Sequence, residues 1–466
     1  MNSRAGFTPW RALLVTSLGT FMATLDGSIV NVALPTIGQA FQAPLPLVQW
    51  VVSAYLLTIS SLLLFFGRLG DIAGRRRVYA WGFLLFTASS ALCGAASSVG
   101  WLVAARVLQG IGGAMLMANS PGLVMSAFPG SRRGRALGVI GLVVGLGSMI
   151  GPALGGLLVG LLGWRSIFYV NIPVGLTAFF LAGRFLPADE PEAEQTLDIV
   201  GAVLFALSMA LLLTGIIHGH DWGWTSLPVL GGLGLALSGL TAFVLYERRV
   251  ASPLFDFSLL GHPVFLTGTI SGCLAFMALL GNILLMPFYL QTVLGMTPTR
   301  TGLVLALLPL SMAALAPLSG YLSERMNHAV LTTTGLTVIA LGLTYNALLG
   351  LAPGHWRAVV GQCLLGAGFG LFQSPNNNSI LSNAPKTRLG LAGGVMALLR
   401  NLGMVCGVAL AVTVYESFRL PGPTPTPETF YPGFRAALLG GALLTLVNIL
   451  LSQSRRRALS RRHPGD

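Results

Sequence analysis

Residues 25–35 read LDGSIVNVALP, and they place Asp26 inside an apolar run that extends from about residue 11 to 33. A run of this length crosses about 30 Å of hydrocarbon as an α-helix. An acid deep in such a helix costs about 2.5–3.5 kcal/mol on insertion scales, which makes it a candidate functional residue. The stretch therefore predicts a membrane helix that carries a functional carboxyl group.

The rest of the chain is equally apolar. Of its 466 residues, 54% are hydrophobic and only 9% are charged, whereas soluble domains carry about 25% charged residues. The sequence predicts an all-α integral membrane protein with fourteen spans, near residues 11–33, 47–66, 78–98, 101–126, 136–160, 166–186, 197–217, 227–246, 264–287, 300–322, 329–350, 357–381, 391–415 and 434–453.

The net charge of +13 reflects topology rather than a nucleic-acid partner. With a cytoplasmic N-terminus, most Lys and Arg residues fall in cytoplasmic loops and tails, and this asymmetry sets orientation. We expect a multi-pass protein of the cytoplasmic (inner) membrane with both termini in the cytoplasm. Its basic tail would contact anionic lipid. The four cysteines lie within predicted spans without a CxxC pair, so we interpret them as packing residues.

An acidic, proline-containing stretch, PADEPEAEQTLD at residues 187–198, divides the chain. Six spans precede it, and two more come before the last six. A weak internal repeat between two loops supports a chain of two repeated halves. GRLGDIAGRRR (67–77) and GYLSERM (320–326) each place an acid four residues after a glycine. Chance recurrence is the alternative. The predicted domains are an N-terminal bundle at 1–186, a linker with two extra helices at 187–262, a C-terminal bundle at 263–454 and a basic tail at 455–466.

Five stretches in order resemble the major facilitator superfamily, and within it the fourteen-span drug:proton antiporters. They are the first-span stretch at 25–35, the loop at 67–77, RVLQGIGGA at 106–114, GSMIGPALGG at 147–156 and GWRSIFYVNIPVG at 163–175. The resemblance covers nearly the whole chain. It implies a major facilitator fold of two six-helix bundles plus two additional transmembrane helices.

By this resemblance, the loop at 67–77 latches the conformation that is closed toward the cytoplasm. Its glycines permit a tight turn, and its acid can pair with a nearby arginine. Ile72 departs from the family pattern, which often has a basic residue there, so Arg135 is a further candidate for the charge network. A purely topological role is the alternative. The predicted latch residues are Gly67, Asp71, Gly74, Arg75 and Arg76.

The fifth span carries small residues at helical spacing, Gly147, Gly151 and Gly155, together with Pro152. Small residues let a neighbouring backbone approach closely, and proline favours a bend. We interpret these four residues as a hinge, as the resemblance to antiporters implies. Plain helix packing is the alternative.

Asp26 and Arg106 are predicted to couple transport to protons. Burial in a low dielectric favours the neutral form of a carboxyl group, so this acid could load and release a proton. If it touches Arg106, the two groups titrate as a unit. The alternative is a structural acid held by Asn31 or by a neighbouring helix. Gln109, one turn from Arg106, is a predicted cavity residue, as is Asn31.

The second bundle offers polar residues but little to protonate. FQSPNNNSI concentrates amides beside a proline that frees a backbone carbonyl, which favours a substrate-facing wall. Interhelical hydrogen bonding is an equal alternative. Arg400 is expected to snorkel toward the cytoplasmic side. The predicted substrate residues here are Tyr289, Gln291, Gln373, Asn376 and Asn377.

In the sixth span, Asn171 and Pro173 predict a bent helix, with the asparagine bonding to backbone that proline leaves unpaired. His218, His220 and Asp221 are interpreted as solvated loop residues, and no metal site is expected. The sequence lacks HExxH, GxSxG and P-loop motifs, so we predict neither an enzyme nor an ATP-driven pump.

These observations predict a monomeric proton-coupled multidrug efflux transporter, without cofactors, that exports amphipathic or cationic compounds by alternating access. Antibiotic resistance would follow from such an activity. The alternatives are a dedicated exporter of one endogenous metabolite or lipid, a facilitated uptake carrier, and a membrane receptor or scaffold that transports nothing.

Overall fold

The structure is a computed structural model that describes residues 9–128, 130–187, 198–250, 261–323, 326, 328–351, 354–383, 389–421 and 426–460. Within the helices, side chains are not described for residues 130–135, 137, 138, 141, 142, 217, 220, 221, 389–391, 394 and 454–460. The predicted acidic linker, except for its two ends, and the side chains of the predicted basic tail therefore lie outside the described residues.

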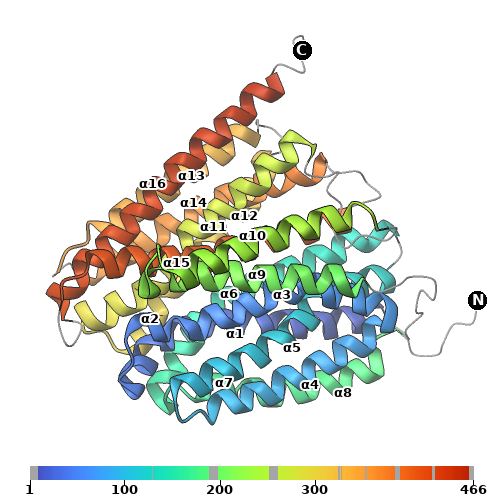
Figure 1. The fold of residues 1–466 in the computed structure, drawn as a ribbon, viewed down its shortest axis with the longest axis horizontal. Coiled ribbons are helices and arrows are strands. Elements are labelled where there is room, and N and C mark those ends of the chain that lie inside the picture. The colour runs from blue at the N-terminus through green and yellow to red at the C-terminus, as the bar shows by residue number, and fades with distance from the viewer. Residues whose placement is uncertain are drawn as a thin grey trace, which may run out of the picture. The chain divides into compact units, whose positions relative to one another are not determined.

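Each of the fourteen predicted spans is a helix, which confirms the fold class. Twelve of these helices contain a segment long and apolar enough to cross a membrane by length and composition, α4 and α14 being the exceptions. The helices are α1 (Pro9–Phe41), α3 (Trp50–Ala73), α4 (Arg75–Gly94), α5 (Val99–Ala127), α6 (Gly130–Leu162), α8 (Asn171–Phe185), α9 (Ile199–Trp222), α10 (Leu227–Glu247), α11 (Pro263–Phe288), α12 (Pro298–Ser323), α13 (His328–Ala347), α14 (His355–Ser382), α15 (Leu389–Phe418) and α16 (Pro427–Ser460) (Figure 1).

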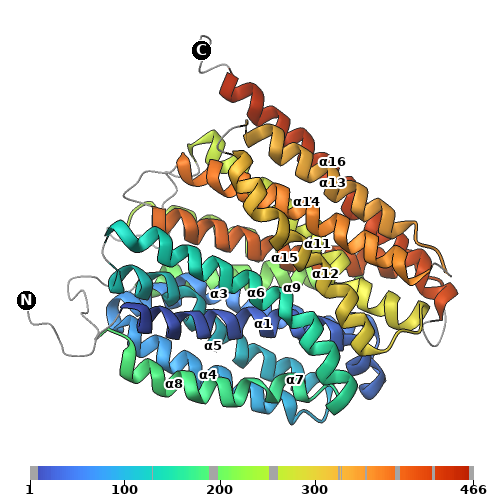
Figure 2. The ribbon, with the colours of Figure 1, turned by 180° about the vertical axis from the view of Figure 1, so that it is seen from behind.

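The chain divides into two compact units. The first comprises Met1–Gly215 with Thr225–Leu254, and the second comprises Ile216–Trp224 with Phe255–Asp466. Within the first unit, α5 packs against α3 and α4, and α1 packs against α6. Within the second unit, α14 packs against α12 and α13, and α11 packs against α15 (Figure 2). The two units therefore repeat one packing plan.

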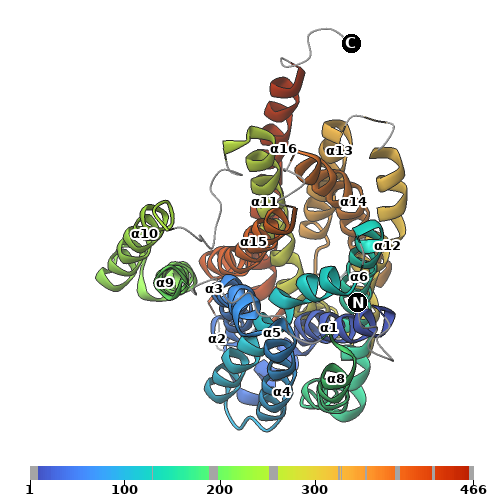
Figure 3. The same ribbon diagram turned by 90° about the vertical axis from the view of Figure 1, so that its right-hand side faces the viewer.

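The helix pair α9 and α10 lies side by side (Figure 3). The ring centroids of Phe205 and Phe243 are 5.2 Å apart, and Gly239 leaves room for the Ser208 side chain. Leucines such as Leu207, Leu235 and Leu237 remain at least 60% exposed. Exposed apolar faces of this kind suit a lipid environment.

A glycine forms the turn between α3 and α4 in the first unit. Gly74 has a φ of 102° and separates α3 from α4. A side chain is rarely compatible with this backbone conformation, and glycine adopts it without steric cost. The turn sets the direction in which α4 returns along α3, and α4 then carries Ser90 into the interior of the unit.

Candidate functional site

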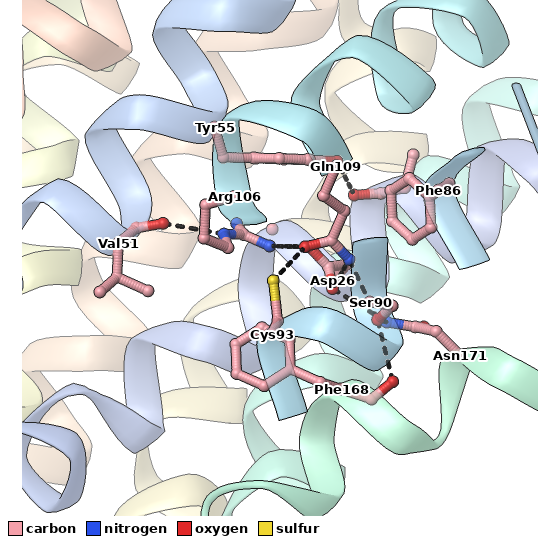
Figure 4. A network of polar contacts seen from close by, with 12 residues as sticks. Asp26, Val51, Tyr55, Phe86, Ser90, Cys93, Arg106, Gln109, Phe168 and Asn171 are labelled. Carbon is pink, nitrogen blue, oxygen red and sulfur yellow. Dashed lines mark hydrogen bonds and ion pairs between the residues drawn. The ribbon is translucent and has the colours of Figure 1, made fainter. Parts of the chain in front are cut away.

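A buried polar network inside the first unit is centred on Asp26 (Figure 4). Asp26 comes from α1, and Arg106 comes from α5; both side chains are fully buried. Arg106 Nη1 donates to Asp26 Oδ2, so the two residues form a hydrogen-bonded ion pair. The sequence left their contact open, and the packing of α1 against α5 creates it.

Two amide side chains complete the coordination of the Asp26 carboxylate. Gln109 Nε2 and Asn171 Nδ2 each donate to Asp26 Oδ1 at 2.9 Å. The same two nitrogens lie 3.2 and 3.1 Å from Ser90 Oγ, and this hydroxyl donates to the Phe168 carbonyl at 2.9 Å. Five helices, α1, α4, α5, α7 (Ser166–Tyr169) and α8, therefore meet through one set of hydrogen bonds (Figure 4).

Arg106 is held on several sides. Its Nε donates to the Val51 carbonyl at 2.8 Å, and its Nη1 donates to Gln109 Oε1 at 2.6 Å. Its guanidinium carbon lies 4.1 Å from the ring centroid of Tyr55, a cation–π contact. The Tyr55 hydroxyl in turn donates to the Ala23 carbonyl at 3.2 Å. The position of the positive charge is therefore fixed by α3 and α5 together.

Helical spacing explains part of this assembly. Arg106 and Gln109 are three residues apart in α5 and so share one face. Asn171 is the first residue of α8, which follows a break after the short helix α7 (Ser166–Tyr169). The prediction that Asn171 bonds to backbone freed by Pro173 is wrong. The break instead directs the side chain toward Asp26 and Ser90. Sequence reasoning missed Ser90 because a serine in a helix is a weak signal.

The network can hold or lose one charge only as a unit. A buried carboxylate that loses its cation is strongly destabilising, because an uncompensated charge remains in a low dielectric. Conversely, a proton on Asp26 would remove the attraction that holds Arg106. The geometry therefore makes the position of Arg106 depend on the charge of Asp26.

Asn31 lies outside this network. It is in α1, and its Nδ2 donates to the Gly27 carbonyl of the same helix at 3.0 Å. The alternative in which Asn31 holds Asp26 does not match this geometry. A substrate contact by Asn31 remains a prediction.

The predicted hinge residues of α6 pack against the opposite side of α1. A Cβ added at Gly151 would overlap Ser28 Oγ and lie 3.1 Å from Ile29 N. One added at Gly155 would lie 2.8 Å from the Ile29 carbonyl oxygen. Ser28 Oγ donates to the Gly147 carbonyl at 3.1 Å. α1 thus lies between the Asp26 network and the glycine face of α6, which consists of Gly147, Gly151 and Gly155. Pro152 lies inside a continuous α6, and movement there remains a prediction.

The predicted latch residues lie at the α3–α4 turn. Arg75 Nε donates to Asp71 Oδ1 at 2.8 Å, and its Nη1 lies 3.5 Å from the Gly122 carbonyl of α5. Arg76 Nη2 donates to the Gly183 carbonyl of α8. Within the first unit, this loop therefore joins three helices. A Cβ added at Gly67 would lie 3.8 Å from the Ala118 Cβ; the side chain of Arg135 is not described.

The predicted substrate residues of the second unit do not form one cluster. Asn376 is buried, and its Nδ2 donates to the Gly268 carbonyl at 3.1 Å. Gln373 Oε1 is buried without a hydrogen-bond donor among the described residues, and Asn377 is half-buried. These residues lie in α14, which packs on α11.

Tyr289 and Gln291 lie apart from that group, in the π-helical turn Tyr289–Val293. The Tyr289 ring is fully buried and stacks on Phe434 with centroids 4.6 Å apart. Its hydroxyl donates to the Gly350 carbonyl at 2.8 Å. This packing accounts for the tyrosine without a substrate, and its role in binding stays a prediction.

Sequence reasoning missed a second buried network, which lies in the second unit. Asn282 Nδ2 donates to Gln362 Oε1 at 3.3 Å, and Asn346 Nδ2 donates to Asn282 Oδ1 at 3.0 Å. All three side chains are fully buried. Asn282, Asn346 and Gln362 each follow a member of the first network, namely Asp26, Ser90 and Arg106, by 256 residues. This constant interval was the signal that could have found them.

A chain of fourteen helices in two repeated units, with a buried ion pair in one of them, has the architecture of a multi-pass membrane transporter. The family model of the Major Facilitator Superfamily matches residues 16–408. The chain belongs to this superfamily.

Relatives of known sequence include transporters of different stated function. The chain is 37% identical over 407 residues to the riboflavin transporter RibZ of Clostridioides difficile (strain 630), covering 86% of this chain and 87% of that protein. It is 36% identical over 410 residues to the multidrug resistance protein Stp of Mycobacterium tuberculosis, covering 87% and 76%.

Among solved structures, the fold is similar to one determined in work on substrate recognition in proton dependent oligopeptide transporters. The TM-score is 0.71 at 15% sequence identity, covering 97% of this chain and 99% of that chain. At this level of identity the likeness concerns the fold alone.

Proposed function

We propose that this protein is a proton-coupled antiporter that exports amphipathic compounds across the cytoplasmic membrane by alternating access. The observation that carries this proposal is the fully buried ion pair between Asp26 and Arg106. We assign proton exchange to this carboxylate, whose three hydrogen-bond donors must rearrange when it takes up a proton, and no cofactor takes part in that step.

In this mechanism, a proton that reaches Asp26 neutralises the carboxylate and weakens its hold on Arg106. The guanidinium then keeps its contacts with Val51 and Gln109, but α1 is free to shift relative to α5. The glycine face of α6 gives α1 a smooth surface against which to move. Release of the proton on the cytoplasmic side restores the ion pair and resets the cycle.

A multidrug substrate range is supported by the relationship to multidrug resistance protein Stp. A dedicated exporter of one metabolite is the second candidate, because the riboflavin transporter RibZ matches over a similar share of the chain. Both candidates use the same proton step and differ only in the substrates accepted.

Reconstitution of the purified protein into vesicles with an imposed pH gradient tests the proposal. Fluorescent amphiphiles, neutral drugs and riboflavin would be offered in parallel, with protein-free vesicles and an uncoupler as controls. Transport that depends on the gradient and accepts several unrelated compounds supports the multidrug function. Transport of riboflavin alone would favour the dedicated carrier, and transport that the uncoupler leaves unchanged would refute proton coupling.

A further inference from the structure

Arg400 is a buried charge that the proposed proton step does not use. It lies in α15, within the apolar segment Val395–Phe418 that is long enough to cross a membrane. Arg400 lies five residues after Val395, about 7.5 Å along the helix axis from the start of that segment. A charge at this depth is costly, and arginines in such positions are normally paired or face a polar cavity.

Arg400 has no hydrogen-bond or ion-pair partner among the described residues. Its side chain is half-buried, and its Nε is buried without an acceptor. Arg106, by contrast, donates to a carboxylate, an amide oxygen and a backbone carbonyl. Each arginine has one buried guanidinium nitrogen without an acceptor, Nη2 of Arg106 and Nε of Arg400, but only Arg106 has a carboxylate partner among the described residues.

The sequence offers few acids that could neutralise Arg400 within its unit. Between Pro263 and Gln453 the acids are Glu324, Glu416 and Glu428. Glu416 lies sixteen residues further along the same helix, about 24 Å away, and is paired with Arg419. Glu428 begins α16 in its first turn, and Glu324 lies outside the described residues.

Snorkelling explains Arg400 less well than a bound partner does. A snorkelling arginine keeps its charged head in water and only its aliphatic stem buried. Here one guanidinium atom, Nε, is buried without an acceptor, although the side chain as a whole is only half-buried. The Nε of Arg400 therefore has no hydrogen-bond acceptor among the described residues, and a ligand could supply one.

We propose that Arg400 binds an anionic group of the transported compound. A carboxylate, sulfonate or phosphate can accept two parallel hydrogen bonds from the guanidinium fork, and such charge-assisted bonds are strong in a low dielectric. The proposal rests on the exporter function and deepens it. It narrows the substrates to amphiphiles that carry a negative charge, and it disfavours the cationic compounds expected from the sequence.

A matched pair of probes isolates this charge. N-phenyl-1-naphthylamine is neutral, and 8-anilinonaphthalene-1-sulfonate differs from it by one sulfonate. Their dissociation constants would be measured by fluorescence on the full chain in nanodiscs of neutral lipid, with empty discs subtracted. The wild-type protein should prefer the sulfonate, and Arg400→Gln should reduce this preference at least tenfold, equivalent to about 1.4 kcal/mol. Arg400→Lys should fall between the two, since it keeps the charge but loses the fork.

Arg419→Gln is the matched control, because Arg419 follows the same helix and already has Glu416 as its partner. It should leave the preference for the sulfonate unchanged. Equal preference in wild type and Arg400→Gln, an equal loss in the Arg419 variant, or no preference in the wild type would each overturn the proposal.

A lipid phosphate could supply the same anionic chemistry, and a second arm separates the two sources. Thermal stability would be compared in discs with and without phosphatidylglycerol. A substrate site predicts that wild type and Arg400→Gln gain the same stability from this lipid. A gain confined to the wild type, with no change in probe preference, would assign Arg400 to a lipid and overturn the proposal.

Failure of the exporter function would be recognised separately, because binding in discs requires no proton gradient. Loss of sulfonate preference in Arg400→Gln, together with gradient-independent behaviour in vesicles, would retain the anion site and refute the coupling. If the wild type exports in response to the gradient and Arg400→Gln keeps the sulfonate preference, the coupling is retained and the anion site is refuted.

Discussion

The two units contain the same polar positions with different chemistry. In the first unit, three equivalent positions hold Asp26, Ser90 and Arg106, and in the second they hold Asn282, Asn346 and Gln362. Both sets are buried and both join helices of one packing plan. The first set contains an acid and its paired cation, whereas the second set consists of amides, which carry no charge at physiological pH.

Glycines reinforce the comparison. Gly403 and Gly407 follow Gly147 and Gly151 by the same interval of 256 residues. A Cβ added at Gly403 would lie about as close to the Cys273 backbone of α11 as one at Gly147 lies to α1. The repeat therefore preserves these two glycines in both units, while amides replace the charged pair of the interior. Under the proposed mechanism, this difference assigns the proton step to the first unit, whereas the Asn282 network of the second unit joins helices through neutral amides.

The largest expected effect comes from replacing the acid of the first network with the amide that the second network has at the equivalent position. Asp26→Asn should reduce gradient-driven efflux to the level of protein-free vesicles, because no titrating acid remains in the network. It also leaves Arg106 without a counter-charge, and breaking a buried pair costs about 3–5 kcal/mol. Efflux and thermal unfolding would be measured on the same preparations.

The double variant Asp26→Asn with Arg106→Gln separates coupling from stability. It removes the unpaired charge of Arg106 and introduces the residues found at the equivalent positions of the second unit, Asn282 and Gln362. Stability should recover while gradient-driven efflux stays absent. Efflux equal to that of the wild type in either variant would exclude Asp26 as the coupling acid.

A smaller but still large effect is expected from Gly151→Leu. Its Cβ would overlap Ser28 Oγ, so α1 and α6 must separate. Overpacking of this kind costs about 1–3 kcal/mol, and turnover should fall strongly. Gly145→Leu in the same helix is the control, because a Cβ there meets no atom within 4 Å. Normal turnover in the Gly151 variant would remove the argument for close helix approach.

An intermediate effect is expected from Asn171→Ala, which removes one of the two amide donors to Asp26 Oδ1. Loss of a buried hydrogen bond destabilises by about 1–3 kcal/mol, and coupling should weaken without disappearing. Thr177→Ala in the same helix is the control, since its hydroxyl donates only to the Pro173 carbonyl of α8. Equal unfolding temperatures and equal efflux for the two variants would argue against a role for Asn171 in the network.

The smallest effect on transport is expected from Asn346→Leu in the second unit. This change removes the hydrogen bond to Asn282 and should lower stability by about 1–3 kcal/mol. The proton step should persist, so the dependence of efflux on the pH gradient should match that of the wild type. If gradient dependence is lost while the protein stays folded, the functional contrast between the two units is incorrect.

The sequence alone determined the helices, because each span is an apolar run whose length matches the bilayer and whose backbone bonds close within the run. It also identified Asp26, Arg106 and Gln109, since charge and amide groups deep in such runs are costly enough to stand out. Family resemblance added the glycine face of α6 and the turn around Gly74.

Only the tertiary structure decided which polar residues meet. Asn171 lies 145 residues from Asp26 along the chain, yet it donates to its carboxylate. Asn282, Asn346 and Gln362 come from three helices and meet in one cluster. Side-chain partners across helices depend on helix rotation and on local breaks such as the one before α8. Hydropathy fixes neither, because it records how apolar a segment is and contains no information about the direction in which each residue points.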